Sequence, residues 1–187
     1  MRSSASRTRR QRSRVADPVD ARRSRAALTL FVTALLTYGV DRITKTWAEA
    51  TLPGGPIDVV PGVLTLRFTT NSGGAFSIGQ KAPWFFVGVT AVVVAIILST
   101  SFRHTSRIVG ASLGLVLGGA LGNLTDRAIR GPGMRGRVVD FIDFHVWPVF
   151  NLADSVIVIG AILLALMGLR ERPGGRKEQP ETTAAPT

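Results

Sequence analysis

The sequence predicts an all-α polytopic membrane protein with four transmembrane helices and a small extracytoplasmic cradle of β-strand and loop. Three observations lead to this fold class. Apolar residues make up 45% of the chain, and they are concentrated in blocks rather than spread along it. Lys and Arg residues gather beside some of these blocks and are sparse beside others. One segment outside the blocks alternates apolar and polar side chains, as a half-buried strand does.

The four blocks have the length of a bilayer crossing, which needs about 20 mostly apolar helical residues. They cover residues 26–45, 82–101, 108–125 and 148–169. The second block is apolar almost throughout, whereas the others carry polar residues near one end. The first block and its Arg-rich start also resemble a cleavable secretory signal. We expect it to remain as an anchor, because Asp41, Arg42 and Lys45 would make the region before a cleavage site unusually charged.

The two ends of the chain have no pattern that could build a core. Residues 1–25 contain nine Arg and two Asp with Ser-rich spacing, and residues 170–187 mix charges with Pro, Gly, Thr and Ala. Such compositions are typical of disorder, so we expect two disordered cytoplasmic tails around one membrane domain at residues 26–169. The basic N-terminal tail suits solvent or lipid headgroups. We expect no nucleic-acid partner, because this tail has no aromatic residue that could stack on a base.

The distribution of basic residues predicts how the blocks are oriented, because cytoplasmic flanks are enriched in Lys and Arg. The N-terminal tail, the turn at residues 102–107 and the C-terminal tail hold nine, two and four basic residues, fifteen of the 23 in the chain. We therefore expect both termini to be cytoplasmic. The longer segments at residues 46–81 and 126–147 then face outward.

The outward segments contain the predicted cradle. Residues 63–70 alternate apolar and polar side chains, which predicts a short strand. A turn follows at residues 71–76, where Gly73 and Gly74 let the backbone approach a neighbour closely. Residues 138–144 form a second apolar stretch, interrupted by two Asp residues, that we expect to lie at the membrane surface. We expect the second of these, Asp143, to be a surface or headgroup contact.

Polar side chains near the outer ends of three blocks should meet at one depth. The first and third blocks run outward and the fourth runs inward, so their polar ends share one level. These ends carry Asp41, Lys45, Asn123, Asp126, Asn151 and Asp154. Ionisable groups beside the hydrocarbon are costly, so their convergence predicts a functional site near the outer leaflet.

Two spacings indicate how this site is packed and oriented. Glycines recur every four residues in the third block, at positions 110, 114, 118 and 122, and form a small-residue ridge on which another helix can pack. We expect Gly118 and Gly122, near the polar end, to have structural roles. The sequences N-L-T-D at 123–126 and N-L-A-D at 151–154 each place an Asn one turn before an Asp, where the amide can orient the carboxyl group.

The carboxylates differ in their sequence neighbours. Asp126 is followed by Arg127 and Arg130, which predicts a structural ion pair at the end of the third block. Asp140 and Asp154 have no basic neighbour. Two such carboxyl groups held together share one proton, so that one acts as base and the other as acid, an arrangement that activates water against a peptide bond. The residues therefore favour catalysis by Asp140 and Asp154 over ion pairing.

Other chemistries fit less well. The chain has no Cys, which excludes disulfides, thiolate metal sites and a thiol nucleophile. His104 and His145 fall on opposite sides of the membrane, so a His-based metal centre is not expected. A hard cation held by the Asp residues is a minor alternative, and we expect neither a metal nor a cofactor. The alternative function is a small proton-coupled membrane transporter that uses the Asp cluster, because intramembrane carboxylates also mark ion paths.

Five motifs follow one another along the chain. They are D-R-I-T-K at residues 41–45, N-S-G-G-A-F at 71–76, G-G-A-L-G-N-L-T-D-R at 118–127, V-V-D-F-I-D-F at 138–144 and F-N-L-A-D-S-V-I-V-I-G at 150–160. In this order they resemble the motifs of the lipoprotein signal peptidases, the signal peptidase II family. The resemblance covers residues 26–169 and leaves both tails outside it. Gly74 stands where this family usually has Ala, and Arg42 where Gln is common.

The resemblance implies a bacterial inner-membrane aspartyl endopeptidase that removes signal peptides from prolipoproteins by cutting before a diacylglyceryl-modified cysteine. It places the catalytic pair on Asp140 and Asp154, in agreement with the argument from their neighbours, and gives Asp126 a structural role. The substrate-binding or site-supporting residues are then Asp41, Lys45, Asn71, Gly74, Asn123, Arg127 and Asn151. The implied partners are diacylglyceryl-modified prolipoproteins and membrane phospholipids, and we expect a monomer.

Overall fold

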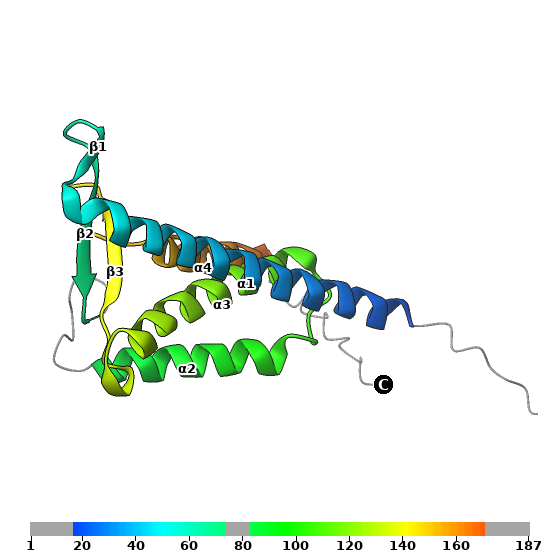
Figure 1. The fold of residues 1–187 in the computed structure, drawn as a ribbon. Helices are drawn as coiled ribbons and strands as arrows, with labels where there is room; N and C mark the ends of the chain where they lie inside the picture. The colour runs from blue at the N-terminus through cyan, green and yellow to red at the C-terminus, as the bar shows by residue number, and fades with distance from the viewer. Residues whose placement is uncertain (1–16, 74–82, 171–187) are drawn as a thin grey trace, which may run out of the picture.

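The computed structural model describes residues 17–73 and 83–170. Helices that run side by side form the body of the molecule, and a small sheet lies across one end of them (Figure 1). In chain order the elements are α1 (Pro18–Thr51), the 3-10 turn η1 (Leu52–Gly54), β1 (Ile57–Val60), β2 (Leu64–Asn71), α2 (Pro83–Thr100), α3 (Arg107–Ile129), the 3-10 turn η3 (Pro132–Met134), β3 (Val138–Asp143) and α4 (Leu152–Arg170).

Three helices within the described residues are long and apolar enough to cross a membrane. They are α1 with its following turn, α3 and α4, and α2 is a shorter apolar helix. The mostly helical membrane fold with a small sheet is thus as predicted, and three of the four expected spans reach this length within the described residues.

Helix α1 begins at Pro18, within the segment that we expected to be a disordered tail, so residues 18–25 are helical rather than disordered. The Asp17 side chain caps the helix by accepting a hydrogen bond of 3.0 Å from the Val19 backbone, and Pro18 occupies the first helical position. Both residues favour a helix start there, because the cap satisfies a free amide and proline lacks the amide that a first turn leaves unpaired. The Arg residues at 22, 23 and 25 therefore extend the helix.

The other helix boundaries shift for similar local reasons. Helix α4 begins at Leu152 rather than at residue 148, because the Asn151 side chain caps it by accepting a 3.0 Å hydrogen bond from the Asp154 backbone. Phe150, two residues before the helix, instead forms an isolated antiparallel bridge with Ile142 of β3. Helix α3 continues to Ile129, one turn beyond the predicted end.

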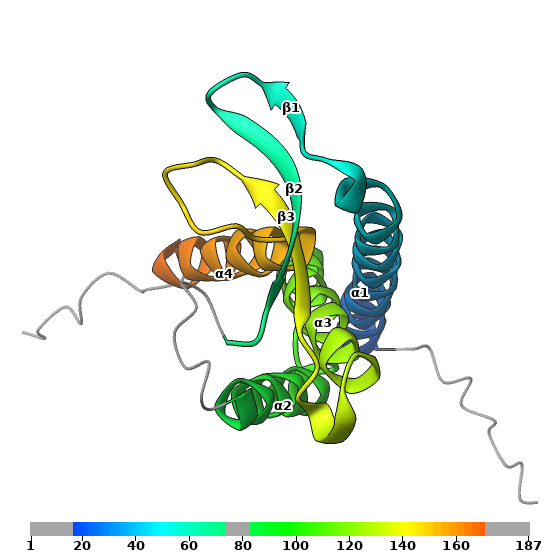
Figure 2. The same cartoon turned by 60° about the vertical axis from the view of Figure 1, so that its left-hand side comes forward.

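Glycines bring α3 into backbone contact with its neighbours. Helix α3 lies between α1 and α4 in Figure 2. A Cβ atom at Gly118 would lie 2.5 Å from the Ala34 carbonyl oxygen of α1, and one at Gly119 would lie 2.7 Å from the Ala153 carbonyl oxygen of α4. Gly122 faces the carboxylate of Asp41 directly. The ridge predicted from the four-residue recurrence is the surface on which α1 packs, and Gly119 provides a second contact surface.

The sheet has the strand order β1-β2-β3, and both pairings are antiparallel. The strand expected at residues 63–70 is β2, displaced by one residue at each end. The stretch at 138–144, expected to lie at the membrane surface, instead forms β3 and is almost fully buried. Val139 and Phe141 of β3 pack with Ala48 of α1, so the sheet is fastened to the end of the first helix.

Candidate active site

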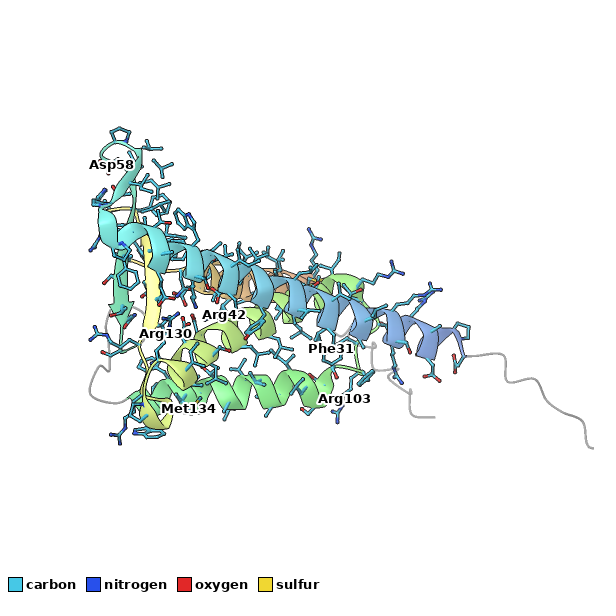
Figure 3. The ribbon with its side chains drawn as sticks, in the orientation of Figure 1. Phe31, Arg42, Asp58, Arg103, Arg130 and Met134 are labelled. Carbon is cyan, nitrogen blue, oxygen red and sulfur yellow. The ribbon has the colours of Figure 1, made fainter. Side chains whose placement is uncertain are left out.

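The predicted site residues meet where the sheet crosses the ends of α1, α3 and α4. Figure 3 labels Arg42 and Arg130 at this end of the helices. Two groups of carboxylates lie here and differ in their partners. Asp140 of β3 and Asp154 of α4 are held by amide side chains. Asp41 of α1 and Asp126 of α3 are held by cations. We call these the amide-held pair and the cation-held pair.

Two asparagines orient the amide-held pair. The Asn151 side chain donates a hydrogen bond of 2.6 Å to Asp140, and the Asn123 side chain donates one of 2.8 Å to Asp154. Asn151 also donates to the Asn123 carbonyl oxygen at 3.3 Å, which links the two amides. Neither Asp140 nor Asp154 forms an ion pair within the described residues. Their direct hydrogen-bond partners among the side chains named here are therefore neutral amides, and cations act on them only from a longer distance.

The register of the sheet brings a third amide to Asp140. Asp140 pairs with Thr69, and Asn71 lies two residues further along β2, opposite Val138. Residues two apart share a face of a strand, so Asn71 and Asp140 point the same way, and the Asn71 side chain donates a hydrogen bond to Asp140. A bulge between Leu66 and Thr69 immediately precedes this point, where one extra residue re-aims the strand.

The surroundings of Asp140 favour its protonated form. Burial, followed by the negative charge of Asp154, raises the pKa of Asp140 to about 7. Hydrogen bonds from Asn151 and Asn71 and the positive charge of Lys45 act in the opposite direction without cancelling the rise. A carboxyl group with such a pKa retains a proton near neutral pH, as an acid catalyst must.

The cation-held pair is centred on Lys45, which is fully buried. Its ammonium nitrogen lies 3.0 Å from an oxygen of Asp41, 3.0 Å from an oxygen of Asp126 and 2.8 Å from the Asn123 side-chain oxygen. These three acceptors match the three donors of an ammonium group. Asp126 also pairs with Arg42 and, at 3.0 Å, with Arg130. This network joins α1 to α3 inside the protein.

The cation-held pair also fixes the backbone on which the amide-held pair stands. Asp126 accepts a 3.3 Å hydrogen bond from the backbone of Val139, the residue before Asp140. Asp41 accepts a 3.1 Å hydrogen bond from the backbone of Ala153, the residue before Asp154. Each cation-held carboxylate thus holds the amide that precedes one member of the other pair.

Two charged residues have different partners from those expected from their neighbours. Arg127 does not pair with Asp126. It is buried and donates to the backbone carbonyl oxygens of Ser72 at 3.4 Å and Gly73 at 2.6 Å, which anchors the segment after Asn71. Asp143, expected to be a surface contact, is buried and accepts a 2.5 Å hydrogen bond from Arg67, which lowers the pKa of Asp143.

The remaining site prediction concerns Gly74. This residue lies outside the described residues.

An apolar cavity of about 720 Å³ opens beside Asp154. Asn71 and Asp154 contribute polar groups to its wall, while Phe144, Trp147 and Phe150 contribute aromatic ones. The cavity can receive an apolar segment with its polar backbone directed toward the amide-held pair. In the part of the chain that the structure describes, no group of three His, Asp or Glu residues is placed to hold a metal ion.

The fold and the site define a helical membrane protein with an amide-held carboxylate pair, of which Asp140 is buried and Asp154 lines an apolar cavity. Residues 33–170 match the family model described as signal peptidase (SPase) II. The chain belongs to the signal peptidase II family and is therefore a peptidase, which leaves the transporter alternative without support.

Curated relatives and solved structures agree with this membership. A lipoprotein signal peptidase of Rhodococcus jostii is 44% identical over 156 residues, which cover 80% of this chain and 78% of the relative. One of Caldicellulosiruptor bescii is 38% identical over 144 residues, covering 77% and 93% of the two chains. Two solved structures described as bacterial membrane enzymes are also similar. The first has a TM-score of 0.71 at 27% identity, and the match covers 81% of this chain and 93% of that one. The second has a TM-score of 0.65 at 29% identity, and the match covers 76% of this chain and 94% of that one.

Proposed function

We propose that this protein removes signal peptides from bacterial prolipoproteins as an aspartic endopeptidase, cutting before a diacylglyceryl-modified cysteine. Its relatives carry the name lipoprotein signal peptidase, which supports the substrate class. The observation that carries the catalytic type is the amide-held pair: neither carboxylate forms an ion pair within the described residues, Asp140 is buried, and the half-buried Asp154 lines an apolar cavity. Such a pair shares one proton and can activate water.

We assign the negative charge of the pair to Asp154, because burial and the charge of Asp154 together raise the pKa of Asp140 despite the hydrogen bonds that Asp140 accepts. Lys45 can only donate, so the oxygen of Asn123 must face Lys45 and its amide nitrogen must face Asp154. The amide then donates to Asp154 and stabilises its negative charge. Asp140, with a pKa raised to about 7, holds the proton. The two groups titrate as a unit. The favoured form of the singly protonated pair has its proton on Asp140 and its negative charge on Asp154.

In the proposed reaction Asp154 takes a proton from a water molecule as the water oxygen attacks the peptide carbonyl carbon. Asp140 donates its proton to the carbonyl oxygen, which forms a neutral tetrahedral diol. As the carbon–nitrogen bond breaks, Asp154 gives its proton to the leaving amine and the diol returns a proton to Asp140. The free carboxyl group and amine are the products, and the pair regains its starting protonation.

The supporting residues act through geometry in this proposal. Asp41, Lys45 and Asp126 hold the backbone beneath the pair, and Asn71, Asn123 and Asn151 orient the two carboxyl groups. Arg127 secures the chain after β2, and Gly118 and Gly122 allow α1 to approach α3. Gly74 follows the segment that Arg127 secures and belongs to the same set.

We place the chain in the bacterial inner membrane as a monomer of one domain, residues 26–169, with phospholipids around it. Helix α2 supplies the fourth crossing, since 18 residues span about 27 Å, close to the hydrocarbon thickness of about 30 Å. The excess of basic residues at the end of the helices away from the sheet supports cytoplasmic termini. The sheet and the site then lie at the outer leaflet.

A gel-shift assay tests the function directly. Purified protein in detergent micelles is incubated with a diacylglyceryl-modified prolipoprotein, in parallel with Asp154→Asn and a matched control, Asp58→Asn, which changes a carboxylate on β1. We expect cleavage before the modified cysteine by the wild type and the control, and none by Asp154→Asn. A folded wild type that leaves the substrate intact would overturn the proposed function, and cleavage by Asp154→Asn would overturn the catalytic pair.

A further inference from the structure

A second cavity lies at the end of the helices opposite the candidate site. It measures about 360 Å³ and forms where the turn between α2 and α3 meets the last turns of α4. The turn contributes polar groups, including Arg103, His104 and Ser106, and α4 contributes Leu164, Met167 and Gly168. None of these residues takes part in the site at the sheet. The cavity therefore combines a polar, basic wall with an apolar one.

Among the described residues, no acidic side chain compensates the positive charge of this cavity. Neither Arg103 nor Arg107 forms an ion pair within the described residues, and no carboxylate lines the cavity. At the sheet end, by contrast, Arg42 and Arg130 pair with Asp126. Figure 3 places Arg103 at the end of α2 that is remote from Arg42 and Arg130. An anion is the ligand that matches such a wall.

The apolar wall indicates that the anion carries hydrocarbon chains. Leu164 and Met167 are half-buried in the cavity, and the neighbouring surface exposes Ile108, Leu166 and Leu169. These side chains lie on α3 and α4, two of the helices long and apolar enough to cross a membrane. A ligand bound here can keep an anionic group at the turn while its chains lie along the helices.

We propose that this cavity binds the phosphodiester headgroup of an anionic phospholipid. Arg103 meets the phosphate and the acyl chains follow the apolar surface of α3 and α4. Basic pockets between transmembrane helices on the cytoplasmic side recognise such headgroups. The bound lipid links the α2–α3 turn to the end of α4, and this role is independent of peptide cleavage.

Two variants remove the two features of the site separately. Arg103→Gln removes the charge and keeps a side chain that can form hydrogen bonds. Gly168→Leu adds a bulky side chain at the cavity wall, and folding should tolerate it because an added Cβ at Gly168 meets no atom within 4 Å. The matched control is Gly39→Leu on α1, where an added Cβ also meets no atom within 4 Å. All variants retain the Arg-rich N-terminal segment, so any lipid attraction by that segment is the same in each.

The test measures lipid binding to the full chain in micelles by native mass spectrometry, with the thermal unfolding midpoint as a second readout. The probes are phosphatidylglycerol, phosphatidylcholine with identical chains, and inorganic phosphate. We expect phosphatidylglycerol to bind at least tenfold more tightly than phosphatidylcholine and to raise the midpoint of the wild type and Gly39→Leu. Both site variants should lose about tenfold in this affinity.

Three outcomes would contradict the proposal. Equal affinity for the two lipids would remove the role of charge. Wild-type affinity in both Arg103→Gln and Gly168→Leu would place the lipid elsewhere. Inorganic phosphate that binds as tightly as phosphatidylglycerol would make this a phosphate site without a role for the acyl chains. Cleavage activity does not enter any of these readouts, so failure here leaves the proposed peptidase function untouched.

Discussion

The cation-held and amide-held carboxylate pairs lie at the same end of the molecule and have opposite surroundings. Lys45 contacts both Asp41 and Asp126 at 3.0 Å, and Arg42 and Arg130 add further positive charge to Asp126. Asp140 and Asp154 receive hydrogen bonds from asparagine amides. A carboxylate whose charge is neutralised by cations is a poor base and a poor acid, whereas one held by neutral dipoles can exchange a proton. Partners, rather than burial, separate structural carboxylates from reactive ones here.

The two pairs are also connected in a defined direction. The cation-held carboxylates accept hydrogen bonds from Val139 and Ala153, the residues that directly precede Asp140 and Asp154. A charged network thus fixes the backbone before both reactive groups, and Asp154 reaches the wall of the apolar cavity. Substitutions in the cation-held pair should therefore change stability, and substitutions in the amide-held pair should change activity.

The largest expected effect is the loss of cleavage in Asp140→Asn and in Asp154→Asn. Each substitution keeps the side-chain shape but removes the acid or the base, so we expect turnover to fall by about 10³-fold or more. Both variants should remain folded, because neither carboxylate holds a cation. Initial rates with a lipid-modified prolipoprotein check the activity, and Asp58→Asn serves as the control. Turnover near the wild-type rate in either variant would sink the assignment of the pair.

The next effect is a loss of stability in Asp126→Asn. Its buried partner Lys45 and the half-buried Arg42 and Arg130 would lose their shared counter-charge, and breaking such a pair costs about 3 kcal/mol or more. We expect a clearly lower unfolding temperature in micelles, whereas Asp20→Asn on the exposed start of α1 should leave it unchanged. An Asp126→Asn protein as stable as the wild type and yet inactive would move this residue into the reactive group.

The third effect is a pH dependence that belongs to Asp140. Because its pKa in the folded protein is raised to about 7, the folded chain keeps a proton that the unfolded chain releases near pH 4. Stability should therefore fall between about pH 4 and 7, by at most about 1.4 kcal/mol per pH unit, and level off above that range. Cleavage should decline above about pH 7, as the proton that Asp140 donates is lost.

Unfolding measurements across this pH range distinguish Asp140 from other groups. The Asp140→Asn variant should show a smaller slope and a higher stability at neutral pH than the wild type. An unchanged slope in this variant would mean that another group carries the pH dependence.

The smallest effect is expected for Arg67→Gln. Arg67 is paired with Asp143 but is itself half-exposed, so solvent screens the interaction. An ion pair that solvent reaches from one side is screened and contributes about 1 kcal/mol or less, even though the Asp143 side chain itself is covered. We expect a small drop in the unfolding temperature and cleavage within about twofold of the wild type, measured in the same assays. A loss of cleavage as large as that of Asp154→Asn would show that ion pairing does not separate the two groups of carboxylates.

The helix packing and the position of the site could be predicted from the sequence, because the residues that determine them recur at helical spacing or lie at the ends of the apolar segments. The glycines of α3 recur every four residues, and the ridge they form packs on α1. The basic residues predict the direction in which each apolar segment crosses the membrane. With these directions, the polar ends of three segments lie at one depth, which predicts that Lys45, Asn123 and Asp154 meet. The strand at 63–70 follows from simple alternation.

The remaining features depend on contacts that are distant in sequence. Val138–Asp143 has no alternating pattern because both faces of β3 are covered, and its partner strand β2 lies about 70 residues earlier. Arg127 binds backbone carbonyl oxygens, which no residue pattern reveals. Sequence reasoning did not assign Arg42 and Glu49 to the site, although they lie one helical turn before and after Lys45, and this spacing was the available signal.

The most direct test of the account measures two properties of the same two proteins. Asp154→Asn and Asp126→Asn are purified in one detergent, and the unfolding temperature and the initial rate of prolipoprotein cleavage are determined for each. The account predicts that Asp154→Asn loses cleavage at wild-type stability, while Asp126→Asn loses stability and its still-folded fraction cleaves substrate. If both variants lose the same property, the division between cation-held and amide-held carboxylates is wrong.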